Sequence, residues 1–101
     1  MIEQFSIVKA SCEFGDMEGK MFVVVSPTDS NEALETVIIA PLKLPNADYP
    51  FRPVIKTLDG HLEICIDQIG SVHHFMILET LDKLTDNDGQ RILAFLRELF
   101  S

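Results

Sequence analysis

"TVIIAPLKLPNADYPF", residues 36–51, joins a β-branched apolar run to a stretch with three prolines. The apolar run predicts a strand over residues 34–40, and its unbroken hydrophobicity is typical of a strand covered on both faces, as in a small barrel. Pro41, Pro45 and Pro50 lack a backbone N–H donor, so we expect that the stretch cannot be a central strand throughout. The prolines also make it stiff, which suits the wall of a site better than a flexible lid.

Strand-like segments lie on both sides of this stretch. Residues 4–10 and 20–26 read as strands, with loops or turns over 12–19 and 27–33. Downstream, residues 52–58 and 61–67 read as strands joined by a two-residue turn at Asp59–Gly60. The second alternates, with Leu62, Ile64 and Ile66 on one face and polar residues and Cys65 on the other. Residues 69–81 are ambiguous, part strand and part short helix.

The C-terminal residues predict an amphipathic helix. Thr85 is a good N-cap, and acidic residues follow it in the first turn, where the helix dipole favours them. The apolar positions of the helix are Ile92, Leu93, Leu96, Leu99 and Phe100. Five or six strands followed by one helix predict a mainly β (α+β) fold, a small β-barrel with a C-terminal α-helix, in a single domain over residues 1–101.

Composition limits the class of function. Sixteen acidic against eight basic residues give a net charge of −8, so the overall field repels nucleic acid and anionic membranes, although a local basic patch can survive. No apolar run approaches the roughly 20 residues of a membrane span, and the N-terminus lacks the pattern of a signal peptide. Two cysteines, Cys12 and Cys65, make no disulfide framework. We therefore expect a cytoplasmic protein.

Four segments resemble one toxin superfamily in their order and spacing: "TVIIAPLKLPNADYPFRPVI" (36–55), "LDG" (58–60), "IDQIGSV" (66–72) and "LDKLTDNDGQRILAFLREL" (81–99). They resemble the MazF/PemK (Kid) toxins of type II toxin–antitoxin systems, whereas "EGKMFVVVSP" (18–27) is more similar to the CcdB branch, which poisons DNA gyrase. The resemblance implies an SH3-like barrel of the CcdB/MazF type, a homodimer, and a toxin neutralised by a cognate antitoxin.

The chain departs from both branches where each acts. By family position, Lys20 and Lys43 replace the catalytic arginine and threonine of the MazF ribonucleases, and Leu99-Phe100-Ser101 replaces the Trp-Gly-Ile tail of CcdB. A lysine lacks the planar, multi-donor guanidinium that suits a phosphoryl transition state. We therefore expect a growth inhibitor that binds its cellular target. The alternatives are a MazF/PemK-type mRNA endoribonuclease with an altered site, and a degenerate, non-toxic homologue that only binds antitoxin.

Candidate site residues follow from these positions. Lys20 and Lys43 are either a weak catalytic or phosphate-binding pair or solvated charges at strand ends. Tyr49 and Arg52 are either a base-stacking and phosphate-binding pair or loop residues packed on the sheet edge. Gln68 holds the position of the family's polar pocket residue, although a hydrogen bond at a helix start explains it as well.

Two further features concern partners and metals. Leu99 and Phe100 are either core residues or a partner-binding tip at the end of the helix. His73 and His74 are adjacent on an extended segment, so we expect their side chains on opposite faces and no metal site. We expect no cofactor. RNA and DNA gyrase are the possible targets, and an antitoxin segment that is chiefly apolar or less acidic than usual suits a chain of charge −8.

Overall fold

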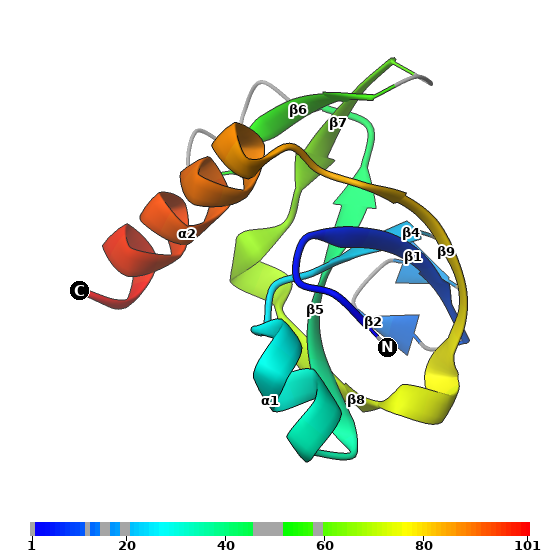
Figure 1. The fold of residues 1–101 in the computed structure, drawn as a ribbon. Helices are drawn as coiled ribbons and strands as arrows, with labels where there is room; N and C mark the ends of the chain where they lie inside the picture. The colour runs from blue at the N-terminus through cyan, green and yellow to red at the C-terminus, as the bar shows by residue number, and fades with distance from the viewer. Residues whose placement is uncertain (1, 12, 15–16, 19–20, 46–51, 58–59) are drawn as a thin grey trace.

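The computed structural model describes residues 2–11, 13–14, 17–18, 21–45, 52–57 and 60–101. The strands are β1 (Ser6–Ala10), β2 (Glu13–Phe14), β3 (Met17–Glu18), β4 (Met21–Val24), β5 (Thr36–Lys43), β6 (Val54–Thr57), β7 (Gly60–Ile64), β8 (Gly70–His73) and β9 (Ile77–Lys83). The α-helices are α1 (Thr28–Ala33) and α2 (Asp86–Phe100), and the 3-10 helices are η1 (Ile66–Gln68) and η2 (His74–Met76). Figure 1 shows a curled antiparallel sheet with α2 beside it, which confirms the predicted mainly β fold with a C-terminal helix.

The main sheet is organised around β5. Its strand order is β6-β7-β5-β4-β1-β9, and β8 also pairs with β5. Residues 36–39 of β5 pair with β8, whereas Leu42 and Lys43 pair with β7. Along its other edge, β5 pairs with β4. β5 therefore belongs to three ladders, and the change of partner from β8 to β7 along one of its edges curls the sheet.

Pro41 lies inside this central strand, so the expectation that strand structure stops at residue 40 is wrong. The proline sits where β5 leaves β8 and meets β7, and its carbonyl accepts a hydrogen bond from the Cys65 N–H at 2.8 Å. A proline disturbs a ladder least at such an irregular position, where a donor is not needed on both edges.

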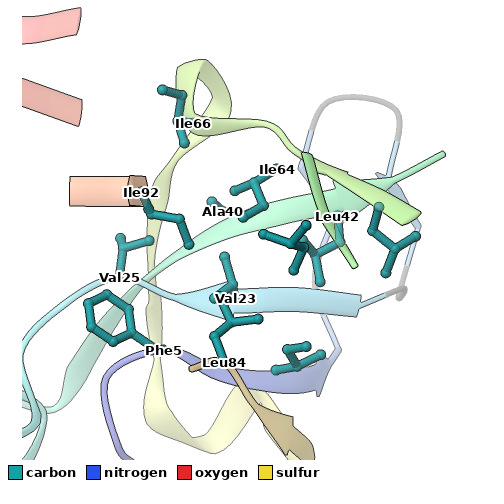
Figure 2. Packing of buried hydrophobic residues seen from close by; sticks show 12 residues of the cluster. Phe5, Val23, Val25, Ala40, Leu42, Ile64, Ile66, Leu84 and Ile92 are labelled. Carbon is teal, nitrogen blue, oxygen red and sulfur yellow. The ribbon is translucent and has the colours of Figure 1, made fainter. Parts of the chain in front are cut away.

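Both faces of the central strands are covered, as the unbroken apolar runs predict. In β4, Val23 belongs to one hydrophobic cluster and Phe22 and Val24 belong to the other. In β5, Ala40 and Leu42 join the first cluster, while residues 37 and 39 join the second. Figure 2 shows the first cluster, in which Ile92 of α2 and Ile66 of η1 pack over the sheet with Phe5, Val23 and Ala40.

Several local predictions need correction. Residues 28–33 form α1 rather than a turn, and Asn31 holds this helix because its Nδ2 donates to the carbonyls of Ile2 (3.0 Å) and Ser26 (3.2 Å). The predicted loop over 12–19 contains the paired strands β2 and β3. Gly60 begins β7 opposite Thr57, at a positive φ of 110°, while Asp59 lies outside the described residues.

The remaining segments match the predictions more closely. The ambiguous segment 69–81 contains β8, η2 and part of β9, so it is both strand and short helix. Thr85 caps α2 as predicted, since its Oγ1 accepts a hydrogen bond from the Asp88 N–H at 3.2 Å. No helix in the described part of the chain is long and apolar enough to cross a bilayer.

Candidate functional site

Arg52 is the centre of a buried polar cluster, because its guanidinium binds two carboxylates. Its Nε and Nη2 donate to the two oxygens of Asp67 at 2.7 and 2.8 Å, and its Nη1 donates to Glu63 at 3.0 Å. The Arg52 side chain is only 6% exposed. The two-pronged bond to Asp67 is the strong geometry for an arginine and a carboxylate, so Arg52 is held in one orientation.

The strands place Glu63 beneath this guanidinium. Glu63 lies in β7, opposite Lys43 of β5 on one side and Val54 of β6 on the other, and it is completely buried. Pro53 follows Arg52, which favours an extended backbone at residue 52, and the Pro53 carbonyl accepts from the Ile64 N–H at 2.9 Å. The pairing with β7 therefore continues one residue beyond β6, and Arg52, at a bend before it, reaches Glu63 through its Nη1.

Asp67 brings η1 into the cluster. The hydrogen bonds from Arg52 hold the pKa of the Asp67 carboxyl below its usual value, and the nearby charge of Lys43 acts in the same direction. The pKa of Arg52 is raised in return, first by its hydrogen bonds to Asp67. Both groups are therefore ionised at neutral pH, and the pair fixes η1 to the residue that precedes β6.

Cys65 and Lys43 complete the cluster. Burial raises the pKa of the Cys65 thiol, although the charges of Arg52 and Lys43 partly oppose this. The thiol is thus protonated and inaccessible, which fits a packed cysteine rather than a nucleophile. Lys43 is half-buried. The cluster therefore contains two basic side chains, Arg52 and Lys43, and two acidic ones, Glu63 and Asp67.

Gln68 ends η1 next to this cluster. Its backbone N–H donates to the Cys65 carbonyl at 3.0 Å, which is the bond of the 3-10 helix itself, so a helix-start hydrogen bond of the Gln68 side chain stays a prediction. Its side-chain Oε1 is buried and accepts no hydrogen bond from the described residues. This oxygen can accept a hydrogen bond at the edge of the cluster. Because the oxygen is buried, a donor group of a binding partner would have to enter the cluster to reach it.

The predicted site residues are only partly brought together. Lys43, Arg52 and Gln68 gather around β7 and η1, while Lys20 and Tyr49 lie outside the described residues. Their roles in binding or catalysis stay predictions.

Leu99 and Phe100 lie apart from the cluster, at the end of α2. They are 41% and 70% exposed, so neither belongs to the core. Leu99 lines a cavity of about 210 Å³ with Ile66, Phe95 and Glu98. Because Ile66 belongs to η1, this 3-10 helix touches the polar cluster through Asp67 and the end of α2 through Ile66. A partner-binding role for Leu99 and Phe100 stays a prediction.

Sequence reasoning did not single out Glu63 and Asp67. The alternation of residues 61–67 predicted both on one polar strand face, whereas Glu63 is completely buried in β7 and Asp67 lies in η1. The information that identifies these two residues lies in the pairing register of the β6–β7 hairpin. Val54 pairs with Glu63, so Arg52, two residues earlier, falls on the same face near Cys65. An arginine there indicates a pair with the acidic residues of the facing strand.

The histidine pair was expected on opposite faces, and this expectation is wrong. The rings of His73 and His74 lie 4.6 Å apart, because the chain turns into η2 after His73. No group of three or more potential metal-ligating side chains is found among the described residues.

Comparisons with known proteins agree with this architecture. The structure is similar to an endoribonuclease in complex with its cognate antitoxin from a mycobacterial species, with a TM-score of 0.82 and 16% identity over 99% of this chain and 95% of that one. It is also similar to the toxin MazF-mt6 of Mycobacterium tuberculosis, with a TM-score of 0.80 and 10% identity over 94% and 95% of the two chains.

A third similar structure is the MazE–MazF complex of Deinococcus radiodurans, with a TM-score of 0.79 and 16% identity over 98% and 94% of the two chains. At these identities the likeness shows the fold. No match is found among curated protein sequences. The model of the PemK-like, MazF-like toxins of type II toxin–antitoxin systems matches residues 3–100, and on that evidence the chain belongs to this toxin family.

Proposed function

We propose that this chain inhibits growth by binding a macromolecular target in the cytoplasm, and that it does not depend on RNA cleavage at the MazF-type site. The family supports its place as the toxin of a type II toxin–antitoxin pair. The polar cluster supports the mechanism, because all the charges that the structure places there are compensated.

The single observation behind this proposal is that two carboxylates hold the Arg52 guanidinium. Its Nε, Nη1 and Nη2 atoms all donate to carboxylates at 2.7–3.0 Å. Phosphoryl transfer is accelerated by preorganised donors that are directed at the developing charge. A phosphate at this position would have to displace the Asp67 carboxylate or lie beside buried Glu63. With Lys20 and Lys43 at the family's catalytic positions, we expect cleavage to be weak or absent.

The end of α2 is the better candidate for contact with the target. The 210 Å³ cavity is lined mainly by apolar side chains, and Phe100 is exposed near the end of the same helix. Exposed aromatic and aliphatic side chains of this kind are typical of protein–protein interfaces. A homodimer and DNA gyrase are two partners that this surface would suit, and we expect the protein to be a homodimer in solution.

RNA endonuclease activity is the second candidate function. It is favoured by the whole-chain structural likeness to proteins described as endoribonucleases. In that case Lys43, half-buried opposite Glu63, is the described basic residue best placed by family position to neutralise a phosphate.

One experiment separates these functions. The chain is induced in bacterial cells without antitoxin, growth is followed, and total RNA and DNA are examined for cuts and for gyrase-linked breaks. Growth arrest with intact RNA is the expected result. Lys43→Ala is compared with Lys56→Ala, a matched exposed lysine on β6. RNA degradation by nanomolar purified protein that is lost in Lys43→Ala but kept in Lys56→Ala would overturn the proposal. Normal growth on induction would indicate the degenerate, non-toxic homologue.

A further inference from the structure

A second surface pocket lies far from the polar cluster, at the other end of β5. It has a volume of about 370 Å³ and is lined by Ile2, Asn31, Glu32, Ala33, Leu34, Glu35 and His74. In Figure 1, α1, the start of β5, β8 and η2 gather at the end of the molecule opposite the β6–β7 hairpin. β5 has eight residues, so the two ends of this strand are roughly 23 Å apart. We call this surface the α1–η2 pocket.

Two segments distant in sequence are fixed together at this pocket. The His74 N–H donates to the Glu35 carbonyl at 2.9 Å, and Thr36 pairs with His73 at the adjacent ladder position. The His73 Nε2 also lies 3.6 Å from a carboxylate oxygen of Glu35. The link from α1 to β5 and the turn from β8 to η2 therefore form one continuous surface.

Two large apolar side chains project from this surface. Leu34 is 58% exposed and lines the pocket, and Phe75 is 76% exposed beside His74. The Phe75 ring contacts both histidine rings, with centroids 4.4 Å and 4.5 Å away, and its N–H donates to the His73 Nδ1 at 3.3 Å. The ring is therefore held in place before any partner arrives. An ordered, exposed aromatic ring loses little entropy on binding, which is a property of binding hot spots.

The charges around the pocket indicate the nature of the partner. The described lining contains two carboxylates, Glu32 and Glu35, and neither lysine nor arginine. Asp29 adds a third acidic residue in the same short helix, and the whole chain carries −8. Two copies of this acidic surface would repel each other, whereas a segment with basic residues would be attracted to it.

We propose that the α1–η2 pocket binds a segment of the cognate antitoxin in which an apolar anchor, packed on Phe75 and Leu34, is flanked by lysine or arginine residues that face Glu32 and Glu35. The inference rests on the function proposed above, in which the chain is one half of a toxin–antitoxin pair. The anchor supplies apolar burial, and the basic residues supply the charge complementarity that selects this segment over an acidic one.

Calorimetric titration tests this assignment. The probe is the full-length antitoxin encoded by the reading frame next to that of the toxin, and the variants are Phe75→Ala and the double variant Glu32→Gln/Glu35→Gln. Phe75→Ala should weaken binding about thirtyfold, the loss typical of an interface hot spot. The charge variant should weaken binding about tenfold at about 50 mM salt and much less at about 500 mM, where screening is strong.

Leu81→Ala is the control, because this leucine is also exposed (43%) but lies on β9, outside the lining of the pocket. It should bind the antitoxin as the unchanged chain does. Circular dichroism and thermal unfolding of each variant verify that the fold is intact. The assignment is overturned if Phe75→Ala and the charge variant bind normally, or if the antitoxin fails to bind the unchanged toxin. Growth arrest by the toxin alone is measured separately, so a failed pocket assignment is distinguishable from a failed proposed function.

Discussion

Replacing Gly89 with alanine should destabilise the protein, although the same change usually stabilises a helix. In an ordinary helix interior, alanine is favoured over glycine by about 1 kcal/mol. In α2, however, a Cβ at position 89 would lie 2.4 Å from two ring carbons of Phe5 and 2.8 Å from a third. Carbon atoms at a normal contact distance are about 3.5–4.0 Å apart, so the overlap exceeds about 0.7 Å with three atoms.

The ring of Phe5 cannot move away easily. It is 7% exposed, and its residue has a positive φ of 69°, a backbone conformation that a phenylalanine rarely adopts. The Phe5 N–H donates to the Val24 carbonyl at 2.7 Å, and the Phe5 carbonyl accepts from the Leu84 N–H at 2.9 Å. Overpacking in such a rigid site costs about 1–3 kcal/mol. Against the helix gain of about 1 kcal/mol, the net loss of unfolding free energy should be about 1–2 kcal/mol.

Urea unfolding at fixed protein concentration measures this loss, and thermal unfolding should show a midpoint lower by about 4–16 °C. The control is Gln90→Ala at the next, exposed position of α2, which should change stability by less than about 0.5 kcal/mol. In a Phe5→Leu background the ring atoms beyond Cδ are absent, so Gly89→Ala should cost at least about 1 kcal/mol less. An increase in stability for Gly89→Ala in the unchanged chain would refute the reasoning, because it would mean that the contact between Gly89 of α2 and Phe5 can accept a methyl group.

Four other outcomes follow from the polar cluster and the helix cap. The pKa of Asp67 is lowered in the folded state, so its contribution to stability is present above the ordinary aspartate pKa and is lost as pH falls through the lower, folded value. Urea midpoints measured between about pH 5 and pH 2 should therefore fall more steeply for the unchanged chain than for Asp67→Asn. Arg52→Lys should lower the free energy of unfolding by about 1–3 kcal/mol, because lysine cannot bind both carboxylates in the same geometry; an unchanged urea midpoint would contradict this. In a Cys12→Ser background, alkylation of Cys65 should be slow in the native protein and fast in urea, since the thiol is buried with a raised pKa; fast native labelling counts against this burial. Thr85→Ala should cost about 1 kcal/mol in the same unfolding assay through loss of the α2 cap, and no change would mean that the cap contributes nothing.

The sequence predicted elements well where a local pattern determined them. The apolar run over 34–40 overlaps β5 and Thr85 caps α2, because strand periods and N-cap chemistry act over a few residues. The alternating segment 61–67 is a strand only as far as Ile64, since residues 66–68 form η1. The helix α1 was missed because its residues are turn formers. Its stability comes from contacts made at a distance, such as the hydrogen bond from Asn31 to the carbonyl of Ile2, 29 positions away.

The candidate site was predicted less completely, for a related physical reason. Family position indicated Lys43 and Gln68, and Arg52 was predicted with Tyr49 as a phosphate-binding pair, but a charged residue is expected to be solvated unless a partner is known. Glu63 is buried beside Arg52, which precedes β6 and donates to its carboxylate, and the strand pattern alone does not reveal this contact. Only the register of the β6–β7 hairpin relates Arg52 to Glu63, and a register is a property of two strands together.

The pairing of β1 with β9 has a consequence for how the protein is synthesised. Ser6, at the start of β1, pairs with Lys83 at the end of β9. The first strand of the main sheet therefore cannot complete its pairing until the last strand has been synthesised. Translation at about 5–20 residues per second needs roughly 10 s for the whole chain, and through most of that time β1 lacks one neighbour. Translation that stops before β9 therefore yields a polypeptide whose sheet cannot close. The main sheet therefore closes only after β9 has been synthesised, and a nonsense mutation as late as residue 76 should produce a chain that lacks this strand and does not reach the native fold.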